Sequence, residues 1–272
     1  MSRPIGAAGI ARALNALSYA GPQTSPSSAA GVVARLGRAA AWSGPRLAAL
    51  TGLPEAEAVA ASPVLVVDRH GLSRIVARAM DEAAPLDSLS GARARLAVLR
   101  VLGATTTGAW DPSTRSRVLV APNVLADAHR FSLDQGDWCK WVALRAGLQG
   151  VLLERAPFLA DASAGPEALL GRLLLVEGLV DALMRSLTPA DLSSVEWLRH
   201  HGPDSSLIRV VARLSPFLDP SAAALLEDHR LIGPFASAVV RDGRLEALLS
   251  DASALPTREE LADPLPWARR AG

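Results

Sequence analysis

Few residues in this sequence combine a reactive side chain with a spacing that chemistry could use. Glu177 and Asp181 stand four residues apart in a segment with helical periodicity, so their carboxylates share one face of a helix. Burying two carboxylates together without a compensating cation is costly. Cys139 is the only cysteine, which excludes an internal disulfide and a cysteine-based metal site. Although Lys140 follows it, no His-containing signature supports a nucleophile, and we expect a packed structural cysteine.

The five histidines do not form a recognisable metal site. His200 and His201 are adjacent, so on a helix they point about 100° apart and cannot chelate as a pair. We expect them to end a helix, where their charge suits the helix dipole. The others are predicted to be surface or capping residues, at His70, His129 and His229. No Gly-x-Ser-x-Gly motif, phosphate-binding loop or dinucleotide-binding glycine pattern occurs, which argues against several other enzyme classes.

The elements that must position these groups are mostly helical. Half of the 272 residues are hydrophobic, chiefly alanine and leucine, and only 4% are aromatic. Asp134 can cap a long helix over residues 135–154, which carries an apolar stripe of Trp138, Trp141, Leu144, Leu148, Val151 and Leu152. The carboxylate pair falls on a second helix, predicted from Pro166 to about Leu187.

A small, mostly antiparallel sheet is expected beside these helices. Residues 64–67 read as a strand, and residues 105–107 and 118–120 as a hairpin around an Asp-Pro-Ser turn at 111–113. Asn123 is predicted to cap a helix that reaches Phe131. The fold class predicted from the sequence is therefore α+β and predominantly helical.

The rest of the chain adds short helices and no boundary between domains. They are expected at residues 5–18, 28–41, 45–52, 72–79, 91–102, 190–199, 205–214, 221–240 (with Gly233-Pro234 as a candidate break) and 245–249. Without repeats or low-complexity linkers, we predict a single domain over residues 1–272. A formal charge of +1 without a basic stripe argues against nucleic acid. No apolar run suits a membrane span and the N-terminus fits a signal peptide poorly, so a cytoplasmic protein is expected.

Six segments in a common order resemble one family of zincin-like metallopeptidases from actinobacteria. Its members are often labelled as candidate hydrolases or as associated with deazaflavin coenzyme biosynthesis. The matching segments are residues 64–69, 108–112, 119–123, 141–144, 177–181 and 255–264. The resemblance covers residues 45–272, with residues 1–44 as a helical N-terminal segment. It implies a zincin-like fold, in which a His-Glu-x-x-His helix and a later Glu-Gly-His-Ala-Asp helix build a zinc site.

The sequence departs from the family at the residues that would hold zinc. Trp141 before the motif and Pro157 after it fix the register. The two motif histidines are replaced by Arg145 and Gln149, and the motif glutamate by Ala146. In the later motif Leu179 stands where the histidine is expected, whereas Glu177 and Asp181 are retained. The family leads one to expect zinc, but these residues predict no zinc and no cofactor.

Arg145 suggests what replaces the metal. We predict that its guanidinium reaches Glu177 or Asp181, so that an ion pair substitutes for the metal as the contact between the two helices. The alternative is that Arg145 points into solvent. Arg145→Ala should then destabilise the protein no more than Arg155→Ala.

The functional prediction is a catalytically inactive homologue, a pseudoenzyme, with a binding or regulatory role. Its partner would be a peptide or a protein, such as an active family member. The alternative is an active hydrolase that uses unrecognised metal ligands or chemistry without a metal.

Overall fold

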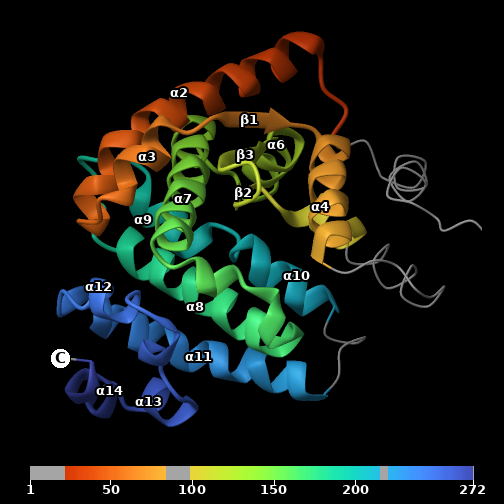
Figure 1. Cartoon of the computed structure of the whole chain (residues 1–272). Coiled ribbons are helices and arrows are strands. Elements are labelled where there is room, and N and C mark those ends of the chain that lie inside the picture. The colour runs from red at the N-terminus through yellow and green to blue at the C-terminus, as the bar shows by residue number, and fades with distance from the viewer. Residues whose placement is uncertain (1–21, 84–98, 215–219, 272) are drawn as a thin grey trace, which may run out of the picture.

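The computed structural model describes residues 22–83, 99–214 and 220–271 of the chain. Its fold is α+β and predominantly helical, as predicted, with one small sheet. The α-helices are α2 (Pro26–Thr51), α3 (Glu55–Ala61), α4 (Arg69–Ala83), α6 (Ala121–Arg130), α7 (Gln135–Arg155), α8 (Pro166–Met184), α9 (Val195–His201), α10 (Ser206–Leu214), α11 (Pro220–Arg241), α12 (Leu245–Leu248), α13 (Arg258–Ala262) and α14 (Pro264–Arg270). Figure 1 shows α2 crossing above α7 and the sheet, with α8 and α11 stacked below.

The sheet is mixed, which corrects the prediction of a mostly antiparallel sheet. Its strands are β1 (Val64–Val67), β2 (Gly108–Asp111) and β3 (Ser116–Val120), in the order β1-β3-β2. β2 and β3 pair antiparallel, whereas β1 pairs parallel with β3. Parallel pairing needs a long crossover connection, and the chain between β1 and β3 provides one that includes α4.

The predicted hairpin is present, but its first strand begins later than expected. Residues 99–105 are helical, so β2 starts at Gly108 and not at Thr105. The Asp111 carboxylate accepts hydrogen bonds from the Ser113 N–H and hydroxyl and from the Thr114 hydroxyl. These bonds lower the pKa of Asp111 although burial alone would raise it. Asp111, the first residue of the predicted turn, therefore stabilises that turn through its side chain.

α7 is the central element of the core. The Asp134 carboxylate caps it by accepting from the Asp137 N–H. Its apolar face is fully buried at Leu144 and Leu148, and it packs against α2, β2 and α8. The helix ends one residue beyond the predicted 154, at Arg155. Cap and apolar periodicity together were sufficient to predict this helix.

Asp137 joins the first turn of α7 to the segment before α9. Its carboxylate accepts from the Ser194 N–H at 2.9 Å, from Lys140 Nζ at 3.0 Å and from the hydroxyls of Ser193 and Ser194. Burial alone would raise the pKa of Asp137, but these hydrogen bonds outweigh it and lower the pKa to about 2.

Arg117 on β3 joins the sheet to the helices above it. It is almost fully buried and donates to the carbonyl oxygens of Ala40 and Ala60 and to the Ser43 hydroxyl. Burial lowers the pKa of Arg117. No carboxylate pairs with it among the described residues, so three neutral acceptors compensate its desolvation.

Two prolines and one asparagine behave differently from the predictions. Pro45 was predicted to start a new helix and Pro234 to be a break, but both lie inside continuous helices, α2 and α11. Both flanks of Pro45 are anchored in the core, by Leu36 and Leu47, and this packing overrides the lost backbone hydrogen bond. Asn123 is not a cap: it is buried within α6 and donates to the carbonyl oxygens of residues 103 and 106.

Smaller differences affect element ends. The helix predicted at 190–199 begins only at Val195, and the one predicted to Leu187 ends at Met184. The predicted helix at 5–18 and most of that at 91–102 lie outside the described residues. Within the described parts of the chain, no helix combines the length and the apolar character needed to cross a membrane.

Candidate functional site

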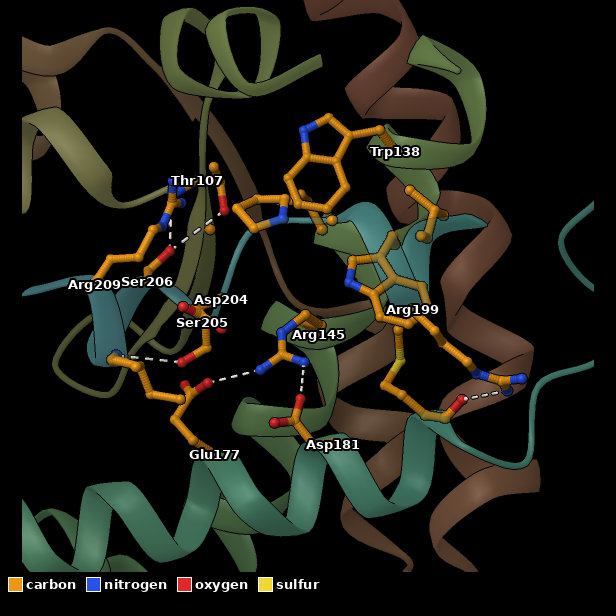
Figure 2. Close-up of a pocket in the computed structure, with 18 of the residues that line it drawn as sticks. Thr107, Trp138, Arg145, Glu177, Asp181, Arg199, Asp204, Ser205, Ser206 and Arg209 are labelled. Atoms are coloured by element: carbon orange, nitrogen blue, oxygen red, sulfur yellow. Dashed lines mark hydrogen bonds and ion pairs between the residues drawn. The ribbon is translucent and has the colours of Figure 1, made fainter. Parts of the chain in front are cut away.

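A cavity of about 350 Å³ opens between α7, α8 and the segment that joins α9 to α10. Figure 2 shows Arg145 near its centre, above Glu177 and Asp181, with Trp138 and the Thr107–Ser206 contact higher in the view. Its wall includes Thr107, Gly108, Trp138, Trp141, Arg145, Gln149, Glu177, Asp181, Leu198, Arg199, Pro203, Asp204, Ser205, Ser206, Ile208 and Arg209. This volume suits a small ligand or a short stretch of a peptide.

The ion pair predicted from the sequence is present and involves both carboxylates. Arg145 Nη2 donates to Glu177 Oε2 at 2.7 Å, and Arg145 Nη1 donates to Asp181 Oδ1. The Arg145 side chain is only 14% exposed, that of Glu177 is 5% exposed, and that of Asp181 is 40% exposed. The planar guanidinium thus contacts two carboxylates one helical turn apart, a geometry that its fork of donors allows.

Gln149 completes the cluster, one turn along α7 from Arg145. Its amide donates to Glu177 Oε1, so both oxygens of this buried carboxylate have a partner. Burial disfavours the charged form of Arg145, but the attraction of Asp181 and Glu177 is stronger and raises the pKa of Arg145 above its ordinary value. The guanidinium is therefore a fixed cation at every physiological pH.

Two of the six former-site positions do not face the cavity. Ala146 and Leu179 are fully buried in the hydrophobic core, and neither lines the cavity. On α8 the residue that faces α7 is Glu177, not Leu179. Residues two apart on a helix point about 200° apart, so Leu179 lies on a different face of α8 from Glu177.

The residues present do not fit a zinc ion. Zinc is held by three or four ligands drawn from imidazole, thiolate and carboxylate groups. The cluster of Arg145, Gln149, Glu177 and Asp181 contains two carboxylates, and only that of Glu177 is buried. Both oxygens of Glu177 already accept hydrogen bonds, from Arg145 and Gln149. No group of three or more His, Cys, Asp or Glu side chains that could hold a metal occurs among the described residues.

Two other arginines of the wall, Arg199 and Arg209, are engaged away from the cavity. Arg209 donates to Asp127 at 2.8 Å and to the Thr105 carbonyl. Arg199 pairs with Glu196 and donates to carbonyl groups at the end of α8. Burial raises the pKa of Asp127, although Arg209 opposes this shift. These arginines hold α9 and α10 in place.

His70, His129, His200, His201 and Cys139 are not among the residues that line the cavity, and the side chain of His229 lies outside the described part of the chain. His200 and His201 occupy the last turn of α9 and contact the carbonyl groups of residues 196 and 197 through Nδ1. His201 also stacks on Trp197 at 3.7 Å between ring centroids. Cys139 is buried, and its burial raises the pKa of the thiol to about 11, which makes it a poor nucleophile.

Sequence reasoning missed the upper wall of the cavity. Asp204 and Ser205 precede α10 and Ser206 is its first residue. The Ser206 hydroxyl accepts from the Thr107 N–H at 3.1 Å. The Gly-Pro-Asp-Ser-Ser stretch marks a turn, but nothing in the sequence places that turn opposite α7. The prediction that Trp138 and Trp141 are core residues holds in part, because both also border the cavity.

No protein-family model matches this sequence, and no curated protein has a matching sequence. One solved structure from Chloroflexus aurantiacus, described as a "putative hydrolase with a novel fold", matches with a TM-score of 0.60 and 19% sequence identity. The match covers 97% of this chain and 96% of the other. At this identity, the similarity shows that the two chains share a fold.

Proposed function

We propose that this protein is a catalytically inactive homologue of zincin-like metallopeptidases whose cleft binds a segment of a peptide or protein. The observation that carries the proposal is the Arg145 guanidinium, which lies between Glu177 and Asp181 where the family would place a metal. The fold shared with a solved structure described as a "putative hydrolase" is consistent with descent from an enzyme.

The cluster opposes metallopeptidase chemistry in two ways. A divalent ion beside Glu177 would meet the fixed positive charge of Arg145 and would compete with it for the same oxygens. Ala146, at the position of the family's glutamate, has no group that could accept a proton from water. Losing a general base alone typically costs about 100- to 10,000-fold in rate.

The cavity beside the cluster supports a binding role. Gly108, the first residue of β2, lines the cavity, and β2 is an edge strand of the sheet. A peptide can bind beside an edge strand through main-chain hydrogen bonds while its side chains enter neighbouring pockets. A cleft of this kind serves binding without needing a metal.

Metal analysis and peptide binding on the purified protein test the proposal. We expect less than stoichiometric zinc, no peptidase activity with or without a chelator, and saturable binding of peptides from a random pool. Stoichiometric zinc together with chelator-sensitive peptidase activity would establish the alternative, an active hydrolase. Peptidase activity insensitive to chelator would establish a hydrolase that needs no metal.

A matched variant tests the zincin-like origin separately. Arg145→His combined with Gln149→His puts two imidazoles one turn apart on α7, opposite Glu177, which is a set of ligands typical of zinc enzymes. We expect this double variant to take up zinc, whereas Arg155→His with Gln149→His should not. A folded double variant without zinc affinity would contradict the zincin-like assignment.

A further inference from the structure

We infer that the cavity selects a positively charged group, the side chain of a lysine or arginine in the bound peptide. This inference rests on the proposed function and specifies its ligand. It follows from three features of the wall: three of its four arginines are paired with carboxylates, two carboxylate groups keep free acceptors, and aromatic rings lie beside them.

Three of the four arginines that line the cavity are paired with carboxylates. Arg199 and Arg209 are paired with Glu196 and Asp127, which do not line the cavity. Arg185 donates to the Ser237 hydroxyl on α11, so its guanidinium is directed to the neighbouring helix. Both terminal nitrogens of Arg145 donate to carboxylates, those of Glu177 and Asp181. Among the described residues, Arg185 is thus the one arginine of the wall that no carboxylate pairs with, and it is exposed at the cavity's edge.

Two carboxylates, in contrast, remain available. Arg145 neutralises one of the two charges of Glu177 and Asp181, which leaves the cluster with a net charge of about −1. Asp181 is 40% exposed, and within the described parts of the chain only its Oδ1 has a partner, so Oδ2 can accept from a ligand. Asp204 stands on the opposite wall, and its carboxylate makes no hydrogen bond or ion pair with any other described residue. Both groups face the same cavity from different elements.

The aromatic wall fits the apolar stem and the charge of such a side chain. Trp141 is half-buried and Trp138 is 3% exposed, and both border the cavity. A Lys or Arg side chain buries its methylene groups against apolar surface, and its cation is attracted to a tryptophan face.

The test uses three fluorescent peptide pools of equal length, one enriched in Lys and Arg, one in Asp and Glu, and one in neutral residues. Fluorescence polarisation measures their binding to the full chain at low and high salt. We expect the cationic pool to bind at least about fivefold more tightly than the others, and salt to reduce this preference. Equal binding of all three pools would overturn the inference and leave the proposed function standing. Binding of none would remove both.

Variants locate the preference in the cavity. Asp204→Asn removes a charge without removing any internal bond, and it should weaken the cationic pool roughly two- to fivefold while leaving thermal stability unchanged. Trp141→Leu should weaken it by a similar factor. Asp242→Asn is the matched control, since Asp242 is exposed, pairs with Arg241 and lies outside the cavity lining. A preference that survives Asp204→Lys with undiminished strength would refute the assignment.

Discussion

Replacing Arg145 by alanine should destabilise the protein far more than replacing another arginine of the same helix. The substitution leaves Glu177 buried, with one oxygen bonded to Gln149 and no compensating cation. Removing one partner of a buried ion pair costs about 3–5 kcal/mol. Asp181 is 40% exposed and can be hydrated in the variant, so its share is small. We therefore expect a loss of about 2–4 kcal/mol in the free energy of unfolding.

Arg155→Ala is the control, because Arg155 also lies on α7 and also contacts two carboxylates. Its distances are 2.9 Å to Glu246 and 3.6 Å to Glu55, and the Glu246 side chain is 72% exposed. Exposed ion pairs contribute about 0–1 kcal/mol. Urea denaturation followed by tryptophan fluorescence measures both variants on the same scale, with the slope of the transition checked for two-state unfolding.

A second substitution separates the ion pair from simple loss of packing. Glu177→Gln in the Arg145→Ala background removes the uncompensated charge and keeps an oxygen that can accept from Gln149, so it should recover more than half of the lost stability. Arg145→Lys should be more stable than Arg145→Ala but less stable than the wild type, since a single ammonium cannot donate in the fork geometry that spans both carboxylates. Equal losses for Arg145→Ala and Arg155→Ala, or no recovery with Glu177→Gln, would refute the reasoning.

Three further perturbations follow from the fold. The folded-state pKa of Asp137 is about 2, below its unfolded value, so its contribution to the free energy of unfolding is complete above about pH 4 and is lost as the pH falls toward 2. Asp137→Asn should remove this pH dependence, a change of about 1–2 kcal/mol in the free energy of unfolding measured by chemical denaturation at different pH values. Arg117→Ala should cost about 2–4 kcal/mol, against less than about 1 for the exposed Arg115→Ala, because buried acceptors lose their donor. Gly178→Ala should cost about 1–3 kcal/mol, since its Cβ would collide with Ile232 Cγ2, and Ile232→Ala should reduce this cost in a double-variant melt.

Local signals in the sequence were enough for some elements and not for others. α7 could be predicted because a cap, an apolar stripe and Pro157 act within one segment. Pro45 misled the prediction because the packing that keeps α2 continuous comes from residues distant in the sequence. The parallel β1–β3 pairing depends on contacts more than fifty residues apart, between Val64 and Arg117 among others, which no local pattern encodes.

The candidate site divides in the same way. The pairing of Arg145 with the carboxylates could be predicted because helical periodicity puts Glu177 and Asp181 on one face. The same periodicity puts Leu179 on another face of α8, where it is buried in the hydrophobic core. Asp204 could not have been identified, since it reaches the cavity through the packing of α9 and α10 against the rest of the chain.

The charge of the cluster links its stability to its proposed ligand. A divalent metal would neutralise two carboxylates, but a guanidinium neutralises only one. The remaining negative charge makes the cavity attractive to a cation. Arg145→Ala makes the net charge of the cluster more negative, from about −1 to about −2. The variant should therefore unfold more easily and yet bind the cationic peptide pool at least as tightly as the wild type does, at a temperature where it is folded. Weaker binding of the cationic pool by the folded variant would contradict this charge argument.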